Sequence, residues 1–245
     1  MVFRRNKHMY NHYAPTQRHN SHHHYSNYNH YGHSNFSFIR NMPYTILLAL
    51  ILIICYILQI LGIVSIEQVA LNTQKVFEFN LISAFTSLFF HANLLHIFFN
   101  LLALIIFSRK VEQEIGIGTI FLFIFGGILA NVIASLYTGF IVQEHYLSIG
   151  ASAGIASLIF FTIIARPLSL LTPFAWFIIL VDILNITNQN TTTNHAVHVT
   201  GYIASLLLIS IINFRNKRFV YRSILFNLLG LIGLYFGLTY YGYLI

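Results

Sequence analysis

The stretch Ile149-Gly150-Ala151-Ser152-Ala153-Gly154 places one serine among small residues, near the start of a long apolar run. Small side chains on a membrane helix allow a neighbouring backbone to approach closely. Most such stripes serve packing alone, and Gly-x-Ser-x-Gly by itself is weak evidence for a nucleophile. We interpret the rest of the chain as a scaffold around Ser152 and look for the polar groups that reach it.

The composition indicates that this scaffold lies in lipid. Of 245 residues, 57% are hydrophobic and only 8% are charged, and the mean hydropathy is +0.70. A soluble domain needs more charged residues to cover its surface. Within a bilayer, each spanning segment satisfies its own backbone hydrogen bonds as a helix. We therefore predict an all-α, polytopic membrane bundle.

Seven apolar segments are candidates for the helices of this bundle. The second is short for a membrane span, whereas the others have suitable lengths. In chain order they are approximately Tyr44–Val64, Leu94–Phe107, Gly118–Tyr137, Tyr146–Ala165, Leu168–Ile186, Ala196–Phe214 and Val220–Ile245.

Residues 1–42 have a different composition, in which His, Asn, Tyr and Ser recur. Such a segment buries too little apolar surface to offset the entropy of ordering, so we expect it to be disordered. Its clustered histidines are also able to bind a transition metal, although nothing in the sequence fixes a geometry. We favour a solvated basic tail that is weakly attracted to anionic lipid.

The lysines and arginines are distributed asymmetrically. If the basic tail is cytoplasmic, alternation of the spans places twelve of the thirteen on the same side and leaves only Lys75 outside. An excess of cations in cytoplasmic loops is the usual orientation signal. We therefore predict a cytoplasmic N-terminus, an external C-terminus and a location in the cell membrane.

This topology brings two candidate catalytic residues to the same depth. The fourth and sixth segments both enter from the outside, so Ser152 and His198 each lie close to the outer surface. A serine hydroxyl attacks poorly unless a base within hydrogen-bond reach takes its proton. His198, Gly201 and Ser205 recur at i, i+3 and i+7, a stripe that lets the sixth helix approach the fourth.

The second segment supplies further polar groups. His96 and Asn100 stand at i and i+4, so they share one helix face. An asparagine in an apolar helix is costly unless it has a partner. Two interpretations remain open: the Asn100 amide bonds a neighbouring helix, or it donates to a developing oxyanion.

In combination, these residues resemble the rhomboid family of intramembrane serine proteases. The resemblance implies a core of six helices with a Ser152–His198 dyad. It also implies an oxyanion hole formed by Asn100, His96 and backbone N–H groups near Ser152. The motifs follow the family's order over approximately Phe77–Phe214, as His91 with His96-x-x-x-Asn100, Glu112-x-x-x-Gly116, Gly150-x-Ser152 and Ala196-Val197-His198-Val199-Thr200-Gly201.

The seventh segment resembles the family's six-plus-one arrangement. We accordingly predict three parts: a cytoplasmic tail at 1–42, a rhomboid-like catalytic core at 43–214, and a cytoplasmic basic loop with the seventh helix at 215–245. Residues 65–93, between the first two spans, mix several phenylalanines with polar residues. We expect this outer segment to lie half-immersed in the outer leaflet, as the resemblance also implies.

Five positions depart from the family's usual pattern. None of them removes a proton-transfer group, so we favour an active enzyme. The alternative is a rhomboid-like pseudoprotease that binds membrane-protein clients without cleaving them. The departures are Ala153 and Ser205 in place of common glycines, Ala156 in place of a common aromatic residue, and Phe79-Asn80 in place of a Trp-Arg pair.

The acidic residues lie mostly away from Ser152. Glu112 and Glu114 follow Arg109-Lys110, and we expect them to pair with these cations at the cytoplasmic end. Asp182 is the one acid within an apolar span, which makes it a functional candidate by default. One interpretation is that Asp182 orients His198 as the acid of a triad, but the resemblance implies a dyad without an acid. We therefore expect Asp182 to form a hydrogen bond or to reach the outer interface, and its replacement to matter little to the chemistry.

The implied reaction is hydrolysis of a peptide bond in a transmembrane segment, close to its outer end. Ser152 attacks, His198 transfers the proton, and Asn100 with His96 stabilises the oxyanion. The expected partners are transmembrane protein substrates and membrane lipid, with no nucleic acid, metal or cofactor. Two other classes fit less well: an α/β-hydrolase nucleophile follows a strand, which is not predicted here, and a transporter is expected to show internal repeats or paired broken helices.

Overall fold

The computed structural model describes residues 42–143, 146–165, 169–186, 194–212 and Leu225, all of which belong to one compact unit, residues 35–245. The predicted tail, apart from Met42, lies outside the described residues. So do the predicted basic loop and seventh helix, apart from Leu225. Those predictions, and the domain boundaries that depend on them, stay predictions.

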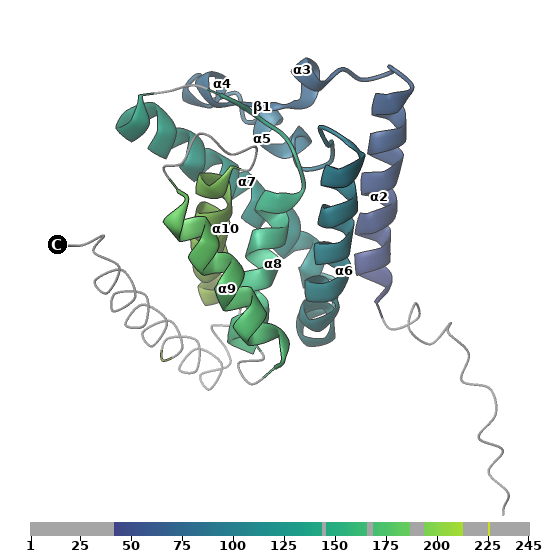
Figure 1. The fold of residues 1–245 in the computed structure, drawn as a ribbon, viewed down its shortest axis with the longest axis vertical. Helices are drawn as coiled ribbons and strands as arrows, with labels where there is room; N and C mark the ends of the chain where they lie inside the picture. The colour runs from purple at the N-terminus through teal and green to yellow at the C-terminus, as the bar shows by residue number, and fades with distance from the viewer. Residues whose placement is uncertain (1–41, 144–145, 166–168, 187–193, 213–224, 226–245) are drawn as a thin grey trace, which may run out of the picture. The chain divides into compact units, whose positions relative to one another are not determined.

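In the part of the chain that the structure describes, six apolar helices form the bundle (Figure 1). Three of them, among the described residues, are long and apolar enough to cross a membrane, and the other three are shorter. The chain is an all-α membrane bundle, as the sequence predicts. The helices are α2 (Pro43–Ile60), α6 (Leu94–Ile115), α7 (Gly118–Tyr137), α8 (Ser152–Ala165), α9 (Leu171–Leu184) and α10 (His195–Ile212).

Two boundaries differ from the prediction. The second predicted segment is not short, because α6 continues past Phe107 through a charged turn to Ile115. The fourth segment becomes helical only at Ser152, since Leu147–Ser148 forms strand β2. This strand pairs antiparallel with β1 (Leu71–Asn72), so the all-α bundle contains one two-residue sheet that the sequence did not predict.

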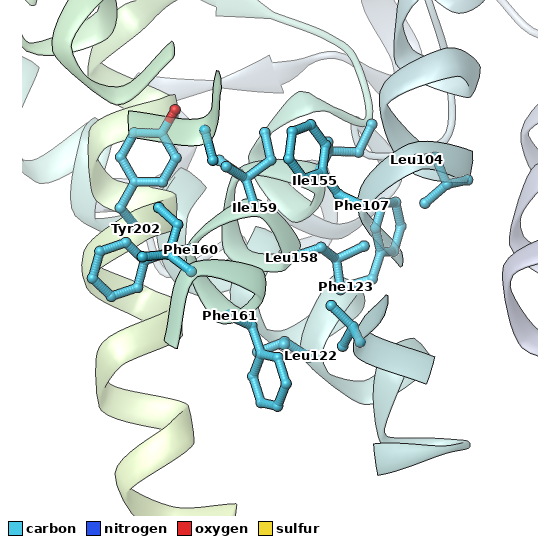
Figure 2. Packing of buried hydrophobic residues seen from close by; sticks show 14 of the residues in the cluster. Leu104, Phe107, Leu122, Phe123, Ile155, Leu158, Ile159, Phe160, Phe161 and Tyr202 are labelled. Carbon is cyan, nitrogen blue, oxygen red and sulfur yellow. The ribbon is translucent and has the colours of Figure 1, made fainter. Parts of the chain in front are cut away.

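Helix α8 lies at the centre of the bundle, between α6 and α10 and against α7 (Figure 1). Every residue from Ala153 to Ile164 is buried, which explains why this helix is apolar on all sides. Figure 2 shows its large side chains among those of the surrounding helices. The shared core includes Phe107 of α6, Phe123 of α7, and Phe161 of α8, each almost fully buried.

Glu112 fastens the far end of α6 to the start of α2. Its carboxylate accepts hydrogen bonds from the backbone N–H groups of Tyr44 at 2.9 Å and Thr45 at 2.8 Å, and from the Thr45 hydroxyl at 2.6 Å. A negative charge is favourable there because the first N–H groups of a helix lack intrahelical acceptors. The expectation that Glu112 and Glu114 pair with Arg109 and Lys110 stays a prediction.

The segment between α2 and α6 folds as short elements at one end of the bundle (Figure 1). After α3 (Ile66–Val69) and β1 come α4 (Thr73–Phe77) and α5 (Ile82–Thr86). Several of its apolar side chains face outward: Phe79 is 91% exposed and Ile82 is 71% exposed. Such exposure of large apolar groups fits the half-immersed segment expected from the sequence.

Candidate active site

Ser152 is the first residue of α8 and is half-buried. The first helical hydrogen bond at this end of α8 is donated by the Ile155 N–H to the Ala151 carbonyl, one turn earlier. The N–H groups at the very start of a helix have no intrahelical acceptor and favour negative charge nearby. Ser152 therefore stands where backbone donors are available for an oxyanion.

The turn before Ser152 is held by glycine and by two histidines. Gly150 has φ +134°, and a β carbon on it would lie 2.7 Å from Nε2 of His96, so only glycine fits here. The Gly150 N–H donates to the Ser87 carbonyl at 2.9 Å. The neighbouring Ala151 N–H donates to Nε2 of His91 at 3.3 Å.

His91 is buried between α5 and α6. Burial, with a smaller contribution from His96, lowers the pKa of His91 to about 3. The ring is therefore neutral, and its Nε2 is able to accept from a backbone N–H. The sequence motif includes His91, but the prediction gave it no role; the structure shows that it fixes the backbone directly before Ser152.

The polar face of α6 lies beside this turn. The Asn93 side chain caps the helix by accepting from the His96 N–H at 2.8 Å. One turn further, Asn100 is buried, and its Nδ2 donates to the His96 carbonyl at 3.0 Å. An amide nitrogen carries two hydrogens, so one of them remains for another acceptor. The predicted pair, His96 and Asn100, thus lies on one face, with His96 against Gly150.

Helices α8 and α10 pack in parallel. Near their starts, Ala153 shares a small buried cluster with Val197. Further along both helices, the rings of Phe160 and Tyr202 lie 6.3 Å apart. Residues further along α8 therefore contact residues further along α10, so the two helices run in the same direction.

A close contact between α8 and α10 shows how far along each helix the residues of the predicted dyad lie. A β carbon on Gly201 would lie 2.8 Å from the Cβ of Ala156, so the backbones meet there without a side chain between them. Ser152 stands four residues before Ala156, and His198 stands three residues before Gly201. Residues at these spacings share a helix face. Ser152 and His198 therefore lie one turn above the same contact, on the two facing surfaces.

His198 is half-buried and is surrounded by polar groups. It lies close enough to His96 for the two rings to interact electrostatically. Its Nδ1 lies 2.9 Å from Oδ1 of Asp182 on α9. His195 Nδ1 lies 2.7 Å from the same oxygen, and the Tyr202 hydroxyl donates to Oδ2. The expected hydrogen bond of Asp182 is thus present, and its partner is the candidate base.

The contacts of Asp182 with His195 and Tyr202 were not predicted from the sequence. A signal for this cluster exists, since His195, His198 and Tyr202 follow i, i+3 and i+7 along one face of α10. Which residue of another helix faces that stripe depends on the rotation of α9, and this cannot be read from the sequence.

The fold and these groups define an integral membrane protein with a candidate hydrolytic site among its helices. A family model, the Rhomboid domain, matches residues 78–216. The match covers more than half of the chain, and the chain belongs to the rhomboid family. A search of the curated proteins finds no match.

Proposed function

We propose that this protein is an intramembrane serine endopeptidase that cleaves transmembrane segments of membrane proteins near their outer face. Ser152 attacks the carbonyl carbon of the scissile peptide bond, and His198 takes the hydroxyl proton. His198 then gives a proton to the leaving amine, and water hydrolyses the acyl-enzyme by the same proton transfers in reverse.

The observation that carries the proposal is the parallel packing of α8 and α10 at Gly201. It supports a serine and a histidine that face each other one turn above a contact between two backbones. Both residues are half-buried, which suits a site that excludes bulk solvent yet admits water and a peptide. Membership of the family gives the same expectation.

The oxyanion of the tetrahedral intermediate requires donors that are already in place. The groups we assign are the free hydrogen of the Asn100 amide, the His96 ring and the backbone N–H groups at the start of α8. His91 and Gly150 support this arrangement because they fix the turn that leads into Ser152. No metal or cofactor takes part in the proposed steps.

The proposed substrates follow from the position of the site. A helical segment hides its peptide bonds in its own hydrogen bonds, so it must unwind before Ser152 is able to attack. Substrates with small or helix-breaking residues near the outer end of their span meet this requirement most easily. We place the protein in the cell membrane with a cytoplasmic N-terminus, on the cation distribution.

A serine-directed fluorophosphonate probe tests the proposal in detergent or liposomes. The wild type is expected to be labelled, with the modified peptide mapped to Ser152, and Ser152→Ala is expected to lose labelling. Ser157→Ala is the matched control, because Ser157 is a buried serine of the same helix that donates to the Gly201 carbonyl at 3.0 Å. Labelling of Ser152→Ala would refute the nucleophile, and a folded but unreactive wild type would favour the pseudoprotease.

A further inference from the structure

Asp182 is a buried carboxylate in the membrane with three hydrogen-bond donors around it. It lies near the end of α9 and is only 3% exposed. His198 and His195 share its Oδ1 at 2.9 and 2.7 Å, and the Tyr202 hydroxyl binds Oδ2. A buried charge is tolerated when donors satisfy its oxygens in this way.

The bond to Asp182 determines which nitrogen of His198 is basic. An ionised carboxylate only accepts hydrogen bonds, so Nδ1 of His198 must carry the hydrogen. The lone pair of the neutral ring is then on Nε2. A histidine that is to remove a proton from serine needs this tautomer, and in serine hydrolases a carboxylate commonly holds it.

The bond to Asp182 also restrains the orientation of the His198 ring. One turn along α10 from His198, Gly201 contacts Ala156 of α8, and neither residue has a side chain large enough to support an imidazole. The ring of His195 lies 6.2 Å from that of His198, at a steep angle. The bond between His198 Nδ1 and Asp182, at 2.9 Å, is directional and therefore sets the orientation of the ring.

We propose that Asp182 is a positioning residue that holds His198 in the tautomer and orientation required of the base, so that the dyad operates as a Ser152–His198–Asp182 triad. This inference rests on the proposed function. It replaces the expectation from the sequence that Asp182 matters little to the chemistry. During the proposed reaction Asp182 keeps its charge, receives no proton, and stabilises the imidazolium that forms when His198 takes the proton of Ser152.

The test is a comparison of cleavage kinetics in the full-length protein, reconstituted with a transmembrane reporter. Asp182→Asn is expected to lower kcat by about 10²–10⁴-fold with little change in KM, because the amide stabilises the wrong tautomer of His198. Asp182→Glu keeps a carboxylate and is expected to recover part of the loss. A structural role would instead lower the amount of folded protein or raise KM, and the carboxylate variant would not restore kcat.

His195→Ala and Tyr202→Phe are the matched controls, since each removes one other donor to Asp182 and leaves its bond to His198. Both are expected to lower kcat by less than about tenfold. A loss in His195→Ala as large as that in Asp182→Asn would overturn the proposal. Full kcat in Asp182→Asn would overturn it too. If Asp182→Asn does not fold, Asp182→Ser takes its place, because it also removes the carboxylate: full kcat in that variant refutes the positioning role.

Two further arms separate this inference from its alternatives. The ligand atoms of Asp182, His195 and His198 lie within 4.8 Å of one another, which is also a donor set for a divalent metal. A chelator such as EDTA is expected to leave the wild-type rate unchanged, and a loss would assign the cluster to a metal and overturn the proposal. A wild type that is neither labelled nor active refutes the proposed function itself, whereas an active wild type with an unaffected Asp182→Asn refutes the triad alone.

Discussion

Replacing Gly201 by alanine tests whether the contact between α8 and α10 sets the geometry of the dyad. The new β carbon would lie 2.8 Å from both the Ala153 carbonyl oxygen and the Cβ of Ala156, whereas ordinary contacts begin at 3.4 Å. The two helices must therefore part by about 0.6 Å at this point. Overpacking of this kind costs about 1–3 kcal/mol of stability.

The same displacement acts on catalysis because Ser152 and His198 lie one turn above the contact. A misplacement of 1 Å costs about 10²-fold in rate, so a shift of about 0.6 Å is expected to lower kcat roughly tenfold. The assay is cleavage of a transmembrane reporter in liposomes, together with thermal unfolding of each variant. Ser205→Ala is the control on the same helix, since the buried Ser205 hydroxyl has no hydrogen-bond partner among the described residues.

The control is expected to be as stable and as active as the wild type, because removing an unsatisfied hydroxyl adds no bulk. Gly201→Ala with unchanged kcat and an unchanged unfolding temperature would refute the reasoning from the α8–α10 contact. A loss of stability without a loss of kcat in the folded protein would show that the contact supports the fold but does not set the dyad.

Three other predictions follow from named contacts. Asn100→Ala is expected to slow cleavage by about 10²–10³-fold with near-normal folding, because it removes one oxyanion donor; an unchanged rate would exclude that role. Glu112→Gln is expected to lower the free energy of unfolding by about 1–3 kcal/mol, because its bonds to the start of α2, including Thr45, lose their charge; thermal unfolding measures this, and an unshifted transition would contradict it. In a cysteine-free background, a cysteine at the exposed Gln74 is expected to react with an impermeant thiol reagent on intact cells and one at Asn216 is not; the reverse pattern would place the dyad at the wrong face.

Much of the bundle follows from the apolar runs alone. A run of apolar residues bounded by polar turns predicts a membrane helix because lipid leaves the backbone no other partner, and six predicted segments appear as helices. The exceptions arise where long-range contacts decide. Leu147–Ser148 is extended because it pairs with β1, and Glu112 binds the start of α2, almost seventy positions earlier, because the first N–H groups of that helix lack intrahelical acceptors.

The candidate site, like the fold, could be predicted from the sequence only in part. Ser152 and His198 were found from motifs and depth, since both stand near the start of helices that run in the same direction. The sequence leaves a bond between Asp182 and His198 as one alternative without deciding it, because that bond depends on how α9 is rotated about its own axis. An apolar helix such as α9 has no strong polar face that would reveal this rotation.

Cleavage by purified protein in liposomes tests the central claim most directly. A membrane-spanning reporter is reconstituted with wild type, Ser152→Ala or His198→Ala, each shown to be folded, and the products are mapped by mass spectrometry. We predict that the wild type cuts inside the span near its outer end, that Ser152→Ala makes no product, and that His198→Ala makes almost none. Cleavage at the same bond by Ser152→Ala, or a folded wild type that cuts none of several reporters, would contradict the account.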